Sequence, residues 1–132
     1  MNRLAGTIRG IESAADVSRV DIDIDGDLFS AVLLDTPETD DYLREGAAIT
    51  MVFKESEVAL AKNFTGLLSF RNQFPSRVES IERGRILTRV GLTYHSVRLT
   101  SLITTRSADI LDLRAGDVVT ALVKANEVTL MR

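Results

Sequence analysis

The chain has no cysteine and no tryptophan among its 132 residues, and aromatic residues make up only 5% of it. The absence of cysteine excludes a disulfide framework, a thiolate metal site and a thiol nucleophile. No apolar run approaches the roughly 20 residues that a membrane-spanning helix requires, and the N-terminus carries no signal-peptide pattern. His95 is the single histidine and is expected at an exposed hairpin tip. We therefore expect a cytoplasmic protein that is not an enzyme and holds no metal ion.

What the chain does contain is an internal repeat at an offset of 70 residues. Residues 2–62 align without a gap on residues 72–132, with 13 identities among the 61 pairs, and most other pairs keep their apolar or polar class. An apolar pattern that occurs twice indicates two copies of one small domain. The predicted domains are residues 1–64 and residues 65–132. Each is small enough to be only marginally stable alone, so the copies should pack together.

Both copies have the residue pattern of β domains. Val20, Ile22 and Ile24 alternate with aspartates, which is the period of a half-buried strand. Asp25-Gly26 then suits a tight hairpin turn, because glycine accepts a positive φ. The short connections after Lys54 and Lys124 predict that the last two strands of each copy form a hairpin. Strands are expected at residues 4–12, 20–25, 28–34, 48–54 and 57–61, and at residues 74–82, 90–94, 97–104, 117–124 and 127–131.

One short helix is expected in each copy. In the second copy it covers Thr105–Leu111, with Thr105 or Ser107 as its N-cap. In the first copy it covers Pro37–Leu43, with Thr36 as the cap and proline in the first turn. The predicted fold is all-β, with two tandem OB-like Greek-key barrels of about five strands and one short helix each.

The net charge of −3 conceals an uneven distribution. Residues 1–62 carry 6 Lys and Arg against 13 Asp and Glu, whereas residues 63–132 carry 10 against 6. The second copy can therefore attract an anion that the first copy repels. The arginines near the first hairpin of the second copy and the alternating aspartates of the first copy are both interpreted as solvated faces.

Four short motifs occur in order in the second copy. They are Ser69-Phe70-Arg71-Asn72, Ile103-Thr104-Thr105-Arg106-Ser107, Leu113-Arg114-Ala115-Gly116 and Val123-Lys124-Ala125. Together, at this spacing, they resemble the molbindin (Mop/TOBE) family of molybdate-binding domains. The resemblance covers all of the second copy and, through the repeat, the first copy more weakly. The tandem arrangement is similar to di-domain molbindins and to the effector region of molybdate-responsive regulators.

The resemblance implies a site for molybdate or tungstate, bound as an intact oxyanion without an organic cofactor. Ser69, Phe70 and Arg71 would supply backbone N–H groups, a hydroxyl and a positive charge, and Lys124 a second charge. Such charge-assisted hydrogen bonds are about twice as strong as neutral ones. The hydroxyls of Thr104 and Ser107 are expected to reach the ion across a subunit or domain interface. Asn72 is expected to fix the loop instead of contacting the ion.

The first copy departs from the family pattern. Lys54 is the counterpart of Lys124 and, with Ser56, could serve a second site. No serine precedes Asn2, however, and Asp35 places a carboxylate near the region where a dianion would bind. Like charges at short range in a poorly hydrated site repel strongly. We therefore predict that the first copy is degenerate as a binder and is kept for packing.

The implied function is storage or homeostasis of the oxyanion in the cytoplasm. A homo-oligomer is expected, with a trimer favoured over a dimer, because a trimer would present six similar barrels in a ring. Two alternatives stay open at this stage: a regulatory or oligomerisation domain with a vestigial anion site, and an OB-type module that binds nucleic acid. The few aromatics and the acidic charge do not favour nucleic acid, and no membrane association is expected.

Overall fold

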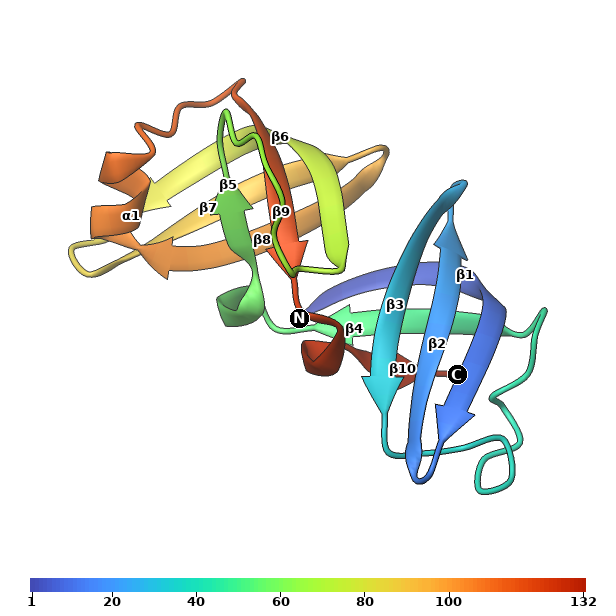
Figure 1. The fold of residues 1–132 in the computed structure, drawn as a ribbon. Helices are drawn as coiled ribbons and strands as arrows, with labels where there is room; N and C mark the ends of the chain where they lie inside the picture. The colour runs from blue at the N-terminus through green and yellow to red at the C-terminus, as the bar shows by residue number, and fades with distance from the viewer.

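The computed structural model describes residues 1–132 and is all-β, with two five-stranded sheets that each curl into an OB-like barrel (Figure 1). We name them barrel 1, built on β1–β4, and barrel 2, built on β6–β9. No helix is long and apolar enough to cross a membrane. The first repeat contributes β1 (Asn2–Ala14), β2 (Val17–Ile24), β3 (Asp27–Leu33), β4 (Ala48–Phe53), the 3-10 turn η1 (Glu55–Glu57) and β5 (Ala59–Ala61). The second contributes β6 (Asn72–Arg83), β7 (Leu87–Tyr94), β8 (Val97–Thr104), helix α1 (Thr105–Ile110), β9 (Val118–Val123), the 3-10 turn η2 (Ala125–Glu127) and β10 (Thr129–Met131).

The first three strands of each repeat form an antiparallel meander, as the alternating pattern predicted. Val20, Ile22 and Ile24 are all at most 3% exposed, whereas the aspartates between them lie on the outer face. The β2–β3 turn has φ angles of 52° at Asp25 and 90° at Gly26, the left-handed conformation that such hairpins require. Each long first strand contains a register shift at the equivalent place, between Ile8 and Gly10 in β1 and between Val78 and Ser80 in β6.

The predicted hairpin of the last two strands is wrong in both repeats. Instead, β5 pairs with β9 of the second repeat, and β10 pairs with β4 of the first. The 3-10 turns after Lys54 and Lys124 do not fold the chain back on itself. Each leads into an extended, buried valine, Val58 or Val128, that carries the chain across to the other barrel. Each barrel thus has the OB strand order only with a final strand from the other repeat.

The exchange of the last strands affects how the chain divides into domains. The predicted bounds 1–64 and 65–132 describe two repeats of the sequence, while the two sheets each combine strands from both. Figure 1 shows η1 and η2 as two separate coils, both in the region where the two barrels meet. The bounds stay a prediction about the repeats, and the barrels are not separable by cutting the chain between them.

The helix predictions have different outcomes in the two repeats. The helix of the second repeat is confirmed as α1, but its N-cap is Thr104, whose hydroxyl accepts a hydrogen bond from the Ser107 backbone N–H at 3.1 Å. Thr105 is buried instead, and its hydroxyl donates to the Gly84 carbonyl at 2.8 Å. This bond ties the start of α1 to the β6–β7 turn.

The predicted helix at Pro37–Leu43 is wrong, because that segment forms only turns. The Thr36 carbonyl accepts hydrogen bonds from the backbone N–H groups of Thr39 and Asp40, but no helical ladder follows. The counterpart of the buried Thr105 is Asp35, which is exposed. A lone carboxylate cannot take the buried position of that threonine without a large desolvation cost, so the anchor of α1 has no equivalent in the first repeat.

A single apolar core of 23 buried residues extends through both barrels. Aromatic rings occupy the junction: Phe29 of β3 stacks on Phe74 of β6 with ring centroids 4.2 Å apart, and Tyr94 meets both rings edge-on. Burial of rings of this size contributes strongly to stability, and their pairing adds about 0.5–1.5 kcal/mol per pair. The two barrels therefore share one core and form one structural unit.

Two asparagines at equivalent positions of the repeats join the barrels reciprocally. The side chain of Asn72 donates to the Ser30 carbonyl at 2.9 Å and accepts from the Ser30 N–H at 2.7 Å. The side chain of Asn2 makes the same pair of bonds to Thr100, at 2.9 and 2.7 Å. Both asparagines are at most 4% exposed. Each amide thus pairs with the backbone N–H and carbonyl groups of a strand in the opposite barrel. The residues of the two contacts are equivalent at the 70-residue offset.

A polar contact joins the two hairpin tips at the same junction. The buried Tyr94 donates its hydroxyl hydrogen to the Asp27 carboxylate at 2.5 Å, and His95 lies 3.2 Å from the same carboxylate. The Tyr94 bond, and then His95, hold the pKa of Asp27 below its usual value. Burial raises the pKa of Tyr94, as does Asp27, so the phenol stays protonated as a donor. His95 is exposed at a hairpin tip, as predicted, but it has a structural contact.

We predict that Asn72→Ala lowers the free energy of unfolding by about 2 kcal/mol, since it removes two hydrogen bonds and leaves the buried Ser30 backbone groups unpaired. Urea denaturation followed by circular dichroism measures the change. Asn126→Ala, at an exposed asparagine of η2, is the matched control and should leave the midpoint unchanged. Equal midpoints for the two variants would contradict a joining role for Asn72.

The contact of Asp27 with Tyr94 and His95 should make the stability of the protein depend on pH. Because folding lowers the pKa of Asp27, its contribution to stability is complete above the unfolded pKa of about 3.9 and is lost as the pH falls through the folded pKa. Asp27→Asn should therefore be less stable than the wild type at pH 7, and the difference should shrink below about pH 4. Thermal unfolding from neutral to acidic pH tests this, with Asp25→Asn at the exposed neighbour as control. A difference that is independent of pH would refute the assignment.

Candidate functional site

Four of the predicted ligand-binding residues lie together at one edge of barrel 2. β6 begins at Asn72 and β9 ends at Val123, and these two residues are paired in register. Neighbours of a paired position in antiparallel strands are themselves adjacent. The loop Ser69-Phe70-Arg71 before β6 therefore lies beside Lys124, which caps η2 after β9. This group of four residues is called the loop cluster below.

The loop cluster is open to solvent and positively charged. Ser69, Arg71 and Lys124 are exposed, and Phe70 is half-buried. Neither Arg71 nor Lys124 forms an ion pair with a carboxylate of the chain. The Gln73 side chain donates to the Phe70 carbonyl at 3.1 Å and so holds the turn. Two cations without an ion-pair partner, a hydroxyl and free backbone N–H groups together form a set of hydrogen-bond donors.

Arg71 also faces the junction between the barrels. It lines a shallow hollow together with Asp27, Phe29 and Gln73, so the β2–β3 hairpin of barrel 1 forms one wall of the loop cluster. Sequence reasoning missed this contribution of Asp27, because the strands involved are distant in sequence. Asn72 was expected to fix the loop; the structure shows that its side chain instead joins β6 to Ser30 of barrel 1.

Thr104 and Ser107 lie at the opposite end of barrel 2. Leu87 pairs with Thr104, and Arg83 near the end of β6 pairs with Thr88, so these hydroxyls are close to the end of β6, not its start. The 12 residues of β6, at about 3.3 Å each, separate them from the loop cluster. Figure 1 likewise shows α1 at the far end of the barrel from η2. One chain does not bring the six predicted residues together.

The hydroxyls of Thr104 and Ser107 are hydrogen-bonded to each other. Thr104 Oγ1 donates to Ser107 Oγ at 2.9 Å while it caps α1. Thr104 also lines a hollow with Arg85, Ile86 and Arg106. Neither of these arginines is paired with a carboxylate, in contrast to Arg83, which pairs with Asp109. We call Thr104, Ser107, Arg85 and Arg106 the helix cluster. It too is cationic and carries hydroxyl groups.

The residues proposed for a second site in the first repeat have a different setting. Asn2 pairs with Phe53, so Lys54 lies beside the start of β1 as Lys124 lies beside the start of β6. Lys54 and Ser56 are both exposed. Two glutamates adjoin them: Glu57 accepts from the Lys54 N–H at 3.0 Å, and Glu55 pairs with Arg89 of barrel 2. The local charge is less favourable to an anion than in the loop cluster.

The comparisons with known proteins agree with this architecture. Residues 68–130 match the TOBE domain family. The fold is similar over 98% of this chain and 94% of the other to the crystal structure of the cytoplasmic molybdate-binding protein ModG with molybdate bound, at 30% identity and a TM-score of 0.91. The high-resolution structure of a molybdate-binding protein from Sporomusa ovata is also similar, at 36% identity and a TM-score of 0.50. This match covers 51% of the present chain and 100% of the Sporomusa ovata chain.

Curated relatives contain this region as part of a longer chain. The molybdenum transport protein ModE of Herbaspirillum seropedicae is 33% identical over 127 residues, which are 94% of this chain and 47% of ModE. The molybdenum import ATP-binding protein ModC of Brucella abortus (strain 2308) is 33% identical over 121 residues, which are 89% of this chain and 32% of ModC. The chain thus spans less than half the length of these relatives. The similarity to ModG extends over both repeats and nearly the whole of both chains, and the chain belongs to the molbindin (Mop/TOBE) family.

Proposed function

We propose that this chain binds molybdate, or the closely similar tungstate, and serves its storage or homeostasis in the cytoplasm. The observation that carries the proposal is the loop cluster: unpaired Arg71 and Lys124, the Ser69 hydroxyl and free backbone N–H groups meet at one edge of a fold that matches molybdate-bound ModG. No reaction is part of this function. The ion is the cargo, and no organic cofactor is proposed.

The chemistry of the loop cluster suits a tetrahedral dianion. Molybdate offers four oxygens that only accept hydrogen bonds, and the loop cluster offers donors to them. Arg71 and Lys124 would neutralise its two charges, while backbone N–H groups and the Ser69 hydroxyl would bind the remaining oxygens. Charge-assisted bonds of this kind contribute about 1.5–3 kcal/mol each, and their combination allows tight binding without a covalent bond to molybdenum.

The complete site is proposed to form between two chains. The loop cluster and the helix cluster lie at opposite ends of β6, so the helix cluster of one chain would meet the loop cluster of another. Both are flanked by exposed apolar side chains that such a contact would cover: Leu67 is 101% exposed beside the loop cluster, and Ile86 and Ile110 are 72% and 77% exposed beside the helix cluster. A closed ring of such contacts favours a homo-oligomer, with a trimer preferred over a dimer.

Lys54 and Ser56 are proposed as a second, weaker site. The first repeat lacks a serine at the position of Ser69, and Glu55 and Glu57 adjoin the lysine. At the far end of barrel 1, Asp35 occupies the position of Thr105. We therefore infer that the first repeat contributes packing and that the second repeat carries the high-affinity site.

One alternative function has a specific observation in its favour. Because a single chain does not unite the two clusters, the chain could act as a regulatory or oligomerisation domain whose anion site is vestigial. The relatives ModE and ModC, in which this region is part of a longer chain, fit such a role. The nucleic-acid alternative has less support, since Phe29, Phe53, Phe74 and Tyr94 are buried and cannot stack on bases.

We predict that Lys124→Ala weakens molybdate binding at least tenfold, because a lost charge-assisted bond costs about 1.5–3 kcal/mol and 1.4 kcal/mol corresponds to a factor of ten. Isothermal titration calorimetry with molybdate, and with sulfate as the competing tetrahedral dianion, measures this. Lys54→Ala is the matched control and should retain most of the affinity. An unchanged affinity in Lys124→Ala would remove this residue from the site, and no heat from the wild type with either ion would favour the vestigial-site alternative.

We further predict that Ser107→Ala weakens molybdate binding although Ser107 is far from the loop cluster in the same chain. Mixing Lys124→Ala chains with Ser107→Ala chains after mild dissociation should restore part of the binding. In the mixed oligomer some interfaces combine an intact loop cluster with an intact helix cluster. Each variant alone has no such interface. Failure of the mixture to exceed the separate variants, in oligomers shown by mass spectrometry to contain both chains, would exclude a site shared between chains.

A further inference from the structure

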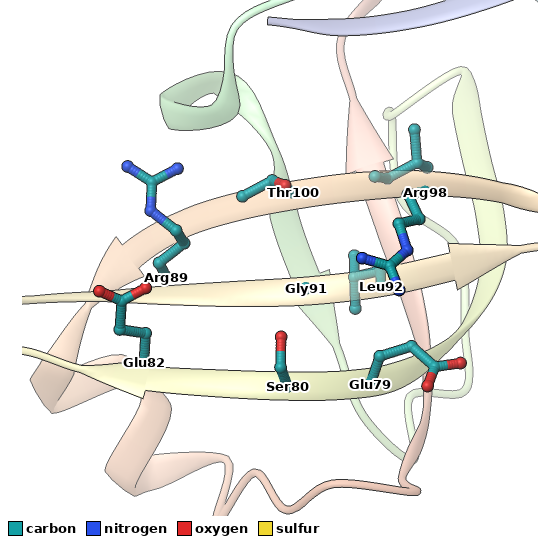
Figure 2. A pocket seen from close by; sticks show the side chains of 9 residues that line it. Glu79, Ser80, Glu82, Arg89, Gly91, Leu92, Arg98 and Thr100 are labelled. Atoms are coloured by element: carbon teal, nitrogen blue, oxygen red, sulfur yellow. The ribbon is translucent and has the colours of Figure 1, made fainter.

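A hollow of about 150 Å³ lies on the outer face of barrel 2, between β6, β7 and β8 and away from the loop cluster. Gly91 forms its floor. Figure 2 shows Ser80 of β6 and Thr100 of β8 on opposite sides of this glycine, with Arg89 and Arg98 toward the two ends. Asn2 of barrel 1 clamps the backbone of Thr100, so this wall of the hollow is held in place.

The first repeat fills the equivalent place with a carboxylate of its own. Asp21 is the counterpart of Gly91, and it pairs with Ser30 as Gly91 pairs with Thr100. Its carboxylate accepts a hydrogen bond from the Ser30 hydroxyl at 2.7 Å and from Arg19 Nε at 3.2 Å. Asp21 therefore shows where a carboxylate binds on this face of the fold and which groups hold it.

The second repeat keeps these donors but lacks the acceptor. Thr100 stands at the position of Ser30, and Arg89 at the position of Arg19. Arg89 uses one terminal nitrogen to pair with Glu55 and has its other nitrogens free. The Thr100 hydroxyl has no hydrogen-bond partner within the chain.

Around the same place, the second repeat has two further donors that the first repeat lacks. Ser80 replaces Gly10, and a Cβ at Gly10 would lie 3.8 Å from the Asp21 carboxylate, so the Ser80 hydroxyl is within reach of a carboxylate bound there. Arg98 replaces Leu28 and forms no ion pair. Four donor side chains thus surround Gly91, and no side chain of the second repeat takes the place of the Asp21 carboxylate.

We propose that this hollow binds a small organic monocarboxylate, whose carboxylate takes the place that Asp21 occupies in the first repeat. Glu79 and Glu82 stand on the rim and, together with Glu55 on Arg89, leave the hollow without a net positive charge, so a dianion such as molybdate is disfavoured more strongly there than a monoanion held by hydrogen bonds. The volume suits a molecule of a few non-hydrogen atoms. The site is independent of the molybdate site.

Nuclear magnetic resonance of the 15N-labelled full chain, titrated with acetate, tests the proposal. The backbone amides of Ser80, Gly91 and Thr100 should shift in a saturable way in the millimolar range. Chloride at matched ionic strength should not move them, and molybdate should act on Ser69–Arg71 instead. Loss of the molybdate response with the acetate response intact would count against the proposed function alone. Absence of a saturable acetate response at the hollow would overturn the present proposal.

A matched variant introduces the Gly10/Asp21 pair of the first repeat at the equivalent positions of the second repeat. Gly91→Asp alone is unsuitable, because a Cβ there would collide with Ser80 Oγ. The double variant Ser80→Gly/Gly91→Asp restores the Gly10/Asp21 pair and should abolish the acetate response while molybdate still binds. Arg98→Leu, which copies Leu28, should weaken acetate several-fold and serves as the test if the double variant does not fold. A response that persists unchanged in the folded variant would overturn the proposal.

Discussion

The reciprocal exchange of the last strands is the constraint on which the rest of this structure depends. β5 closes barrel 2 and β10 closes barrel 1, so neither five-stranded sheet is complete without the other repeat. Asn2 and Asn72 reinforce the exchange through buried hydrogen bonds that run in both directions. Units of about 60 residues bury too little surface to be stable alone, and the exchange gives the two barrels one shared core.

The same arrangement positions the residues of the proposed site. The loop cluster lies where β6 begins and β9 ends, next to the crossing segment η2, and the β2–β3 hairpin of barrel 1 forms its wall. The helix cluster lies at the far end of β6. In the proposed site, the helix cluster of one chain therefore meets the loop cluster of another. Ligand binding at such interfaces would stabilise the assembled state by mass action.

The two repeats keep one backbone but differ in the chemistry of their surfaces. Asp35 and Thr105 occupy equivalent positions, and only the threonine can be buried to anchor a helix. Asp21 and Gly91 are also equivalent, and one supplies a carboxylate where the other leaves a hollow. At these two positions the first repeat carries a negative charge that the second lacks, in keeping with the difference in net charge between the repeats.

The sequence by itself determined the all-β class, the duplication, most strand positions and the helix at Thr105. These follow from local alternation, turn residues and spacing, which act over a few residues, whereas the expectation that Ser69 to Arg71 lie beside Lys124 came from the resemblance to the molbindin family. Only the tertiary structure decided that the final strands cross between barrels, that Asn72 joins β6 to Ser30, and that Thr104 lies far from the loop cluster. The short 3-10 turns after Lys54 and Lys124 are compatible with a hairpin or a crossing. The choice depends on which sheet edge buries Val58 and Val128, and that is settled by packing between residues distant in sequence.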